Sequence, residues 1–540
     1  MAWRSIPSRK ILSLNSNEND GEEEEPLLRT YVQPQFHSQV DPEITFQEAK
    51  PLSGIVFYFM AIHFLLAFTE IILVAPLVRL FENSLCLSHY GFPDGGVAEA
   101  MCKIHEVQAP LATIRGWKST FDTIPVLLVA IPIGKLGDRL GRRKIMAMSL
   151  LGVAGSLTEI FIVCAFPRTF HLRLVWLSSA ILLCGGGLNA ASAFMWAMAS
   201  QSIPSETRQA KHIFRRHITN LLCRSHSFYY IFSAFYIAEL ISSFVASVTL
   251  DISPWIPCGL AMGSVMLCQA ILAIMPDPLM RSSPLYPVPD ITLATGVPEN
   301  SGDRAVQSLK KESVNGLVDA LSNRNIQLIV PVFLVGIFRY AMLNVLIQYA
   351  SVRFGLKIST GATFYTETAV VNIFLFLIII PQLTSYVRLR YNLEAHVIDL
   401  FLVRTSVALM CIGCLAIGFA QKSTILPIGV SVYAAGFGSR VSALALISYW
   451  ISDDAKASSY AAIVVLESLG HAVGDPLIQQ IFAASLSLPP FWMATPFFVG
   501  AAFYGLAVMS SSLIRHEKMP VNNLESTLSF EENQDWQNNS

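Results

Sequence analysis

The chain has 540 residues, of which 53% are hydrophobic and only 14% are charged, whereas charged residues make up about 25% of an ordinary soluble protein. This composition excludes a typical soluble domain and indicates a membrane protein. The formal net charge of −1 gives no basic excess for nucleic acid, so the bilayer, and not a nucleic acid, is the expected environment.

Residues 1–53 are predicted to form a disordered N-terminal tail. The stretch "NSNENDGEEEE" has almost no apolar side chain, so it cannot bury enough surface to offset the entropy of ordering. Within the tail, Glu23 precedes Leu27 and Leu28 in an acidic dileucine arrangement of the kind that sorting adaptors bind. The alternative is a solvated tail without a sorting role.

Twelve apolar runs follow, each long enough to cross the roughly 30 Å apolar core of a bilayer as a helix of about 20 residues. They predict an all-α membrane protein with 12 transmembrane helices in two six-helix halves, 54–275 and 327–514, joined by a central loop, 276–326, and followed by a tail, 515–540. The runs lie near 54–80, 111–134, 145–166, 174–200, 228–250, 257–275, 327–350, 361–383, 398–420, 424–450, 459–484 and 491–514.

The distribution of Lys and Arg predicts the orientation. Most of these 37 residues fall in segments that are cytoplasmic if the N-terminus is cytoplasmic, and Lys and Arg concentrate in cytoplasmic loops. Both termini and the central loop are therefore expected in the cytoplasm. The connection 201–227 is unusually long; it is either a basic amphipathic surface segment or an insertion from a gene-model error.

Cys86 and Cys102 stand apart from the other cysteines. Both are expected in the first outside loop, which faces an oxidising compartment, so they can close a disulfide. The alternative is two unpaired thiols. The remaining cysteines are scattered and form no metal or redox motif.

The stretch "GKLGDRLGRRK", residues 134–144, lies between the second and third apolar runs. Gly134 begins the predicted gating motif, Gly137 and Gly141 permit a tight turn, and Asp138 can meet the positive end of a neighbouring helix. The guanidinium groups of Arg139, Arg142 and Arg143 can bridge carboxylates or carbonyls between helices. Such a cluster is either a gating latch between two rocking bundles or a positive cytoplasmic loop without that role.

This stretch resembles the signature loop of the major facilitator superfamily, in the place where that family carries it. The 6 + 6 arrangement extends the resemblance over roughly 54–514, and "TEIILVAPLVRLFENSLC", "RFGLKISTGATFYTE" and "YAAGFGSRVSAL" are similar to fungal efflux-type members. The resemblance implies inverted three-helix repeats, a cavity lined by helices 1, 4, 7 and 10, and alternating access. It also implies that Asp138 approaches the start of helix 11, near "SDDAKASS".

The sequence departs from the family in two helices. Helix 4 has Gly185, Gly186 and Gly187 but no arginine ahead of them, and helix 5 lacks the G-x-x-x-G-P of many antiporters. A related "GHAVGDP" occurs in helix 11 instead. These departures weaken the assignment to the antiporters.

Acidic residues inside the spans are the candidates for proton coupling, because ionisable side chains are costly in a bilayer and usually serve a cavity or a partner. Glu70 in helix 1 and Glu239 in helix 5 are the first two, and a structural hydrogen bond is the alternative for Glu70. Glu467, His471 and Asp475 recur every four residues, so they share one face of helix 11. That face is a proton relay or, as we favour, a polar seam between helices. Asp122 is expected to pair with Arg115 or Lys118.

Arg339 in helix 7 and Arg440 in helix 10 are the candidates for the substrate cavity. They can hold an anionic or carbonyl-rich substrate, or they can neutralise Glu70 and Glu239 across the halves. No catalytic, nucleotide-binding or metal-binding motif is found, so neither an enzyme nor a cofactor is expected.

The carboxylates inside the spans and the lack of a nucleotide-binding motif therefore predict a monomeric, proton-coupled secondary transporter of a small organic molecule. The resemblance to fungal members implies export of a secondary metabolite or xenobiotic. Proton-coupled uptake and a receptor without transport are the alternatives. The plasma membrane is the expected location, and the vacuolar membrane is the alternative.

Overall fold

A computed structural model describes residues 52–93, 96–202, 224–276, 324–336, 338–391, 395–450 and 453–514. The N-terminal tail with its dileucine pattern, most of the connection 201–227, most of the central loop and the C-terminal tail lie outside the described residues. Within the described ranges the regular elements are helices and no strand is present. The prediction of an all-α fold is confirmed.

The first six predicted spans all form helices, which we call the N-terminal half. They are, in chain order, α1 (Leu52–Ile72) with α2 (Val74–His89); α3 (His105–Leu140); α4 (Arg142–Ala165); α5 (Ser178–Ile181) with η3 (Leu182–Cys184) and α6 (Gly187–Ser202); α8 (Arg224–Leu250); and α9 (Trp255–Ile274). Two 3₁₀ turns, η1 (Glu99–Cys102) and η2 (Leu172–Trp176), lie in the connections.

The last six predicted spans form the C-terminal half. They are α11 (Arg324–Gly336) with α12 (Phe338–Phe354); α13 (Ile358–Phe374) with the π-helical η7 (Leu375–Ile379) and α14 (Ile380–Tyr391); α15 (Ala395–Phe419); α16 (Leu426–Ala434) with η9 (Ala435–Gly438) and α17 (Ser439–Trp450); α18 (Asp453–Ser485); and α19 (Thr495–Ser512). Short 3₁₀ turns, η8 (Ser423–Ile425) and η10 (Trp492–Ala494), precede α16 and α19.

Ten of these helical segments are long and apolar enough to cross a membrane. The other two predicted spans, α3 and α18, are the charged, proline-containing helices of 36 and 33 residues. Large apolar side chains such as Leu128, Phe244 and Ile274 are exposed on the outside of the bundle, as expected for surfaces that face lipid. All 12 predicted spans are thus helical in the described residues, and ten of them meet the length and apolarity of a membrane span.

One boundary differs from the prediction. The first span does not end near residue 80 but continues as α2 to His89, so Cys86 lies in a helix and not in a loop. The reason is the helical spacing of its buried side chains, among them Val78, Phe81, Glu82 and Cys86, which keeps one face of α2 against the rest of the bundle.

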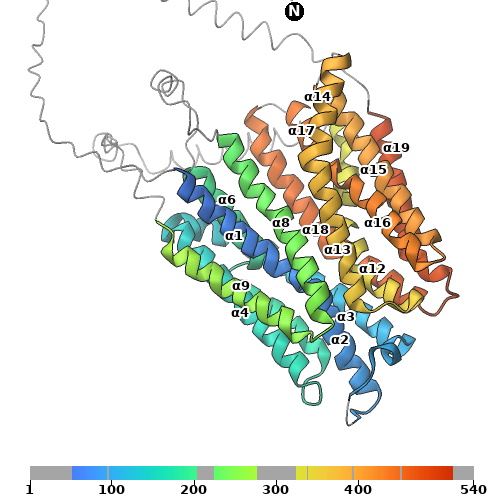
Figure 1. Ribbon diagram of the computed structural model, residues 1–540. Helices are drawn as coiled ribbons and strands as arrows, with labels where there is room; N and C mark the ends of the chain where they lie inside the picture. The colour runs from blue at the N-terminus through green and yellow to red at the C-terminus, as the bar shows by residue number, and fades with distance from the viewer. Residues whose placement is uncertain are drawn as a thin grey trace, which may run out of the picture. The chain divides into compact units, whose positions relative to one another are not determined.

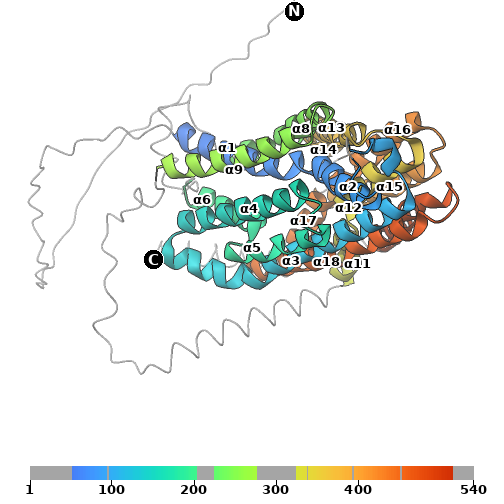
Figure 2. The same cartoon turned by 90° about the horizontal axis from the view of Figure 1, so that it is seen from below.

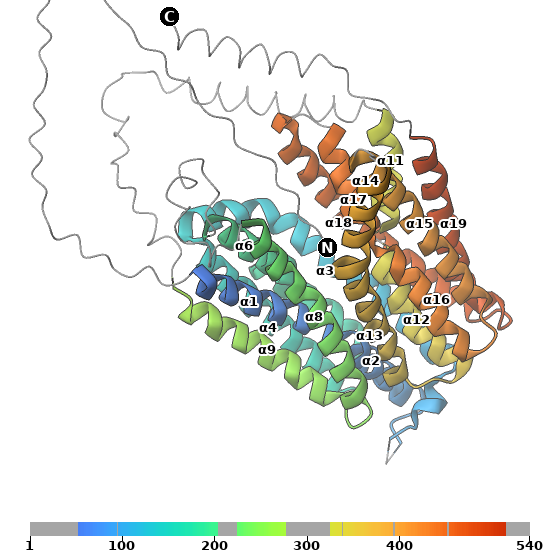
Figure 3. The ribbon, with the colours of Figure 1, turned by 45° about the horizontal axis from the view of Figure 1, so that its top comes forward.

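The two halves meet mainly at one end of the bundle. Figures 1 and 3 show their ribbons close together around α2, α3, α12 and α13, and diverging toward α6 in one half and α14 in the other; Figure 2 gives the view from below. We call the end with the Cys86–Cys102 disulfide the outer end, and the end with residues 134–144 the inner end. Both halves contribute to one continuous apolar core.

Candidate functional site

Glu239 and Arg339 form the centre of the candidate site, at the junction of the halves. Glu239 lies in α8, is fully buried, and neither of its carboxylate oxygens has a hydrogen-bond partner among the described residues. Arg339 lies in α12 of the other half and interacts electrostatically with Glu239. Asn372 of α13 is buried beside Glu239. A carboxylate is thus balanced by a guanidinium that belongs to the opposite half.

Aromatic rings hold the Arg339 guanidinium. Its central carbon lies 4.7 Å from the ring centroids of both Tyr340 and Phe437, which favours a cation electrostatically. One Nη donates to the Phe437 carbonyl at 3.4 Å, and Nε has no partner among the described residues. Phe437 belongs to η9, where helix 10 changes from α-helical to 3₁₀ geometry. The sequence "AGFG" therefore offers both a ring and a carbonyl to Arg339.

Glu70 lies two residues before the end of α1, which a turn at Leu73 separates from α2. It is exposed, it makes no hydrogen bond with any described residue, and it interacts electrostatically with Glu239 and Tyr340. The predicted pair Glu70 and Glu239 therefore belongs to one cluster, with Arg339 beside Glu239. A carboxylate in such a place can exchange a proton without first breaking a hydrogen bond.

The second predicted guanidinium has a different partner. Arg440 of α17 donates from Nε and Nη to the two carboxylate oxygens of Glu467 in α18, at 2.6 and 2.8 Å. Bidentate pairing of this kind fixes both side chains. The two arginines thus have different partners. Arg339 interacts electrostatically with Glu239 of the opposite half, whereas Arg440 pairs with Glu467 of its own half.

His471 and Asp475 continue the same face of α18 toward the outer end. Asp475 Oδ2 accepts a hydrogen bond from Ser119 of α3 at 2.5 Å, and His471 interacts electrostatically with Asp475. One turn away, Thr120 donates to the Ala472 carbonyl at 2.7 Å. These contacts make the outer part of this face a polar seam between the halves.

A chain of buried amides continues the junction at the outer end. Gln348 Nε2 of α12 donates to Gln108 Oε1 of α3 at 2.8 Å, and both side chains are at most 1% exposed. Gln108 in turn donates to Glu82 at 2.6 Å, and Arg115 donates to Gln348 at 3.3 Å. Gln108, Gln348 and Glu82 are not among the residues predicted from the sequence, although Gln348 is a polar residue in the apolar run of helix 7 and so carried a signal.

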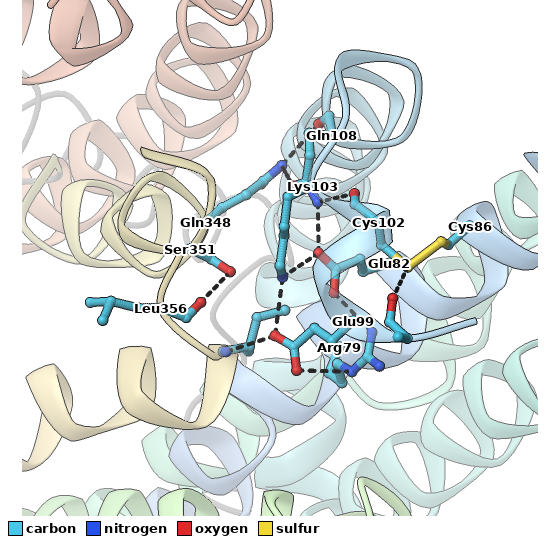
Figure 4. A network of polar contacts seen from close by, with 12 residues as sticks. Arg79, Glu82, Cys86, Glu99, Cys102, Lys103, Gln108, Gln348, Ser351 and Leu356 are labelled. Atoms are coloured by element: carbon cyan, nitrogen blue, oxygen red, sulfur yellow. Dashed lines mark hydrogen bonds and ion pairs between the residues drawn. A yellow bond between two sulfur atoms is a disulfide. The ribbon is translucent and has the colours of Figure 1, made fainter. Parts of the chain in front are cut away.

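The disulfide lies beside this chain. Cys86 of α2 and Cys102 of η1 are joined, with their Cα atoms 5.4 Å apart. Figure 4 shows the disulfide next to Glu82, Glu99, Lys103 and Gln108. It attaches the connection between α2 and α3 to the end of α2.

The predicted gating loop lies at the inner end. Gly141 separates α3 from α4 with φ of +95°, a conformation that favours glycine. A side chain at Gly137 would lie 2.6 Å from Phe194 of α6, whereas Gly134 has free space. Arg139 is exposed. The Asp138 side chain and the first turns of α18 lie outside the described side chains, so their pairing stays a prediction.

Two arginines of this loop bind the N-terminal half itself. Arg142 donates to the Ala197 carbonyl of α6 at 3.1 Å, and Arg143 donates to the Ala273 carbonyl of α9. Both acceptors lie near helix C-termini, which favour cations. The loop therefore connects the inner ends of α4, α6 and α9.

The predicted partner of Asp122 lies in the same helix. Lys118 Nζ lies within 2.6 Å of both carboxylate oxygens of Asp122. Of the two predicted partners of Asp122, Arg115 and Lys118, the structure shows Lys118. No cluster of three or more His, Cys, Asp or Glu side chains that could hold a metal is found among the described residues.

The comparisons with known proteins agree with this architecture. No protein-family model matches the chain. The chain is 26% identical to the MFS efflux pump atnC of Emericella nidulans over 83% of this chain and 84% of that protein. It is also 26% identical to the efflux pump ustT of Aspergillus flavus, over 77% and 80%.

Solved structures show the same fold. A D-xylose-proton symporter superposes with a TM-score of 0.58, at 13% identity, over 86% of this chain and 98% of that one. A bacterial homologue of the iron transporter ferroportin superposes with a TM-score of 0.56, at 11% identity, over 87% and 100%. The resemblance to fungal efflux-type members of the major facilitator superfamily is therefore confirmed, and the chain is an integral multi-pass membrane protein.

Proposed function

We propose that this chain, which has the major facilitator fold and similarity to fungal efflux pumps, exports a small organic molecule in exchange for protons. The observation that carries the proposal is Glu239, a buried carboxylate that makes no close hydrogen bond with a described residue and interacts electrostatically with Arg339 of the opposite half. Both termini and the inner end face the cytoplasm in this proposal, in agreement with the distribution of Lys and Arg.

The coupling follows from the position of the two charges in different halves. While Arg339 lies near Glu239, its positive charge stabilises the carboxylate. Rocking of the halves moves Arg339 away, and burial in apolar surroundings then favours the protonated, neutral form of Glu239. Proton uptake and release at Glu239 are thereby tied to the change of access. Glu70, exposed and electrostatically linked to Glu239, is the second group that exchanges protons.

Substrate is expected to bind near Glu70, Tyr340 and Arg339, whose side chains are exposed or half-buried. Phe437 is buried and supports the Arg339 guanidinium from behind, while the half-buried Tyr340 supplies an aromatic ring for an organic molecule. For an exporter, substrate and proton must compete for the same carboxylates, so that binding of one releases the other. The observation that favours export is the printed description of the relatives as efflux pumps.

The test is flux in proteoliposomes with a pH gradient of either polarity, over a panel of fluorescent organic cations, anions and neutral compounds. An exchanger accumulates substrate when the interior is acidic, whereas a symporter requires an acidic exterior. We expect Glu239→Gln and Glu70→Gln to abolish gradient-driven accumulation but to retain exchange of labelled for unlabelled substrate. Accumulation driven only by an acidic exterior would support uptake, and binding without flux would support a receptor.

Glu367→Gln is the matched control. Glu367 is also an intramembrane carboxylate, in α13, but it accepts a hydrogen bond at 2.5 Å from Ser431 of α16 in the same half. Gradient-driven accumulation should remain in this variant. Unchanged accumulation in Glu239→Gln would remove Glu239 from the coupling mechanism.

A further inference from the structure

Helix α13 begins without a cap of its own. Its N-cap residue, Lys357, makes no side-chain capping bond, although the first turn of any helix leaves backbone N–H groups unsatisfied. The N–H of Ile358, the first residue of α13, instead donates to Glu99 Oε1 at 3.0 Å. Glu99 belongs to η1 of the N-terminal half, so a helix of one half is capped by the other.

Asp251 makes a second contact at the same helix end. It follows α8 in the N-terminal half, accepts a hydrogen bond from Ser359 Oγ at 2.8 Å, and lies 3.6 Å from Lys357 Nζ. Two carboxylates from separate connections of one half thus bind three consecutive residues of the other. Carboxylates are favourable here because a helix N-terminus carries a partial positive charge.

The groups around Glu99 keep it with the N-terminal half. Lys103 Nζ lies 3.1 Å from one carboxylate oxygen and Arg79 Nε lies 3.6 Å from the other. Lys103 and Arg79 also contact the buried Glu82 of α2. The disulfide fastens η1 to α2, as Figure 4 shows. Contacts within the N-terminal half therefore hold Glu99 in place independently of α13. Separation of the outer ends would remove the cap from α13.

We propose that Glu99 and Asp251 are positioning residues that hold the outer end closed by capping α13 across the halves. We call these two carboxylates and their contacts the outer latch. It lies at the same end as the Gln108–Gln348 pair, and Thr366 of α13 donates to Ser243 of α8 at 3.0 Å two helical turns further along. The inference rests on the proposed function only in assuming that the two ends open in alternation.

Hydrogen exchange measured by mass spectrometry on the full-length protein in nanodiscs tests the latch without substrate or gradient. In Glu99→Ala and Asp251→Ala we expect exchange to rise roughly tenfold, as for a lost charge-assisted hydrogen bond. The rise should include the start of α13, the segment around Gln348 and the segment around Ser243. At the inner end, exchange in α14 and in residues 134–143 should fall, because closing that end accompanies opening of the other.

The controls separate a latch from a local or general effect. Glu106→Ala should change none of these segments, since the exposed Glu106 makes no hydrogen bond among the described residues. Glu99→Gln, which keeps an acceptor for the Ile358 N–H, should show a smaller change and remains available if the alanine variant does not fold. A rise confined to the first turn of α13, or a rise at both ends of the bundle, would overturn the proposal. Because no flux is measured, its failure is distinguishable from failure of the transport hypothesis.

Discussion

Gln348 donates two hydrogen bonds to Gln108 across the junction of the two halves, from its Nε2 to Oε1 of Gln108 at 2.8 Å and to the Gln108 backbone oxygen at 2.9 Å. The residues are 240 positions apart in sequence. Because both amides are buried, each must be satisfied by protein groups. The pair also lies between two charges, Glu82 behind Gln108 and Arg115 behind Gln348. It therefore joins the two halves at the outer end, and its hydrogen bonds must break if the halves separate there.

Gln348→Met should destabilise the closed outer end. The methionine fills a similar volume but leaves the buried Oε1 of Gln108 without its donor and removes one of the two acceptors of Arg115, which keeps the Asn344 carbonyl. An unsatisfied buried polar atom costs about 1–3 kcal/mol. We expect a lower melting temperature of the purified protein and faster hydrogen exchange of α3 and α12 at the outer end. Gln269→Met is the control, since Gln269 donates to the Ala147 carbonyl at 2.7 Å within one half; it should lower stability without opening the junction.

Gly137→Ala should lower the thermal stability of the protein, whereas Gly134→Ala should not. The added methyl group at Gly137 meets the Phe194 ring at 2.6 Å, whereas at Gly134 it meets nothing within 4 Å. Overpacking costs about 1–3 kcal/mol, while glycine to alanine in an open helical position gains up to about 1 kcal/mol. Thermal unfolding of the two variants gives the comparison. Adding Phe194→Leu to Gly137→Ala should restore part of the lost stability. If the two glycine substitutions changed stability equally, the contact between Gly137 and Phe194 would be contradicted.

The sequence predicted the 12 spans because the bilayer imposes long apolar runs that can be counted without knowing their packing. It also offered two alternatives for Arg339, substrate binding and neutralisation of a carboxylate of the other half, and Arg339 interacts electrostatically with Glu239. In both cases the signal was local: an apolar run, or an ionisable residue inside one. The loop at residues 134–144 indicated the resemblance to the major facilitator superfamily, because its glycines and charges have a fixed spacing.

The junction at the outer end could not be predicted in the same way. Glu99, Asp251 and Ile358 lie in connections or at helix ends, where a polar residue is unremarkable. Their roles depend on which helices meet, and that is a property of the folded bundle. The position of Cys86 could not be predicted for a similar reason. Helix α2 continues beyond the apolar run because one of its faces stays buried, and a count of apolar residues does not detect a one-sided pattern.

The lowered pKa of Glu99 predicts how the stability of the outer latch depends on pH. Burial alone would raise its pKa, but Lys103, the Ile358 N–H and Arg79 together hold the pKa of Glu99 below its ordinary value of 4.5. A carboxyl group whose pKa is lowered by folding stabilises the folded state above its ordinary pKa, and this contribution is lost as the pH falls through the lowered value. The latch should therefore stay closed at the pH of most compartments.

The measurement compares the melting temperature of the wild type with that of Glu99→Gln between pH 7 and pH 3. The difference should be constant down to about pH 4.5, the ordinary value for glutamate, and should then shrink as Glu99 of the wild type is protonated. Glu106→Gln, at an exposed position, should show no such change. A difference that is already lost at pH 6 would mean that Lys103 and Arg79 do not stabilise the Glu99 carboxylate.

Removal of the disulfide should weaken the outer latch through Glu99. The bond between Cys86 and Cys102 closes a short loop, with a sequence separation of 16, and such a bond contributes about 3 kcal/mol by restricting the unfolded chain. It also fastens η1, which carries Glu99, to α2. Reduction should therefore lower the melting temperature and raise exchange at Ile358. A variant with Cys86→Ala and Cys102→Ala should show both effects without reductant and no further response to it. If exchange at Ile358 stayed unchanged while stability fell, Lys103 and Arg79 alone would be sufficient to position Glu99.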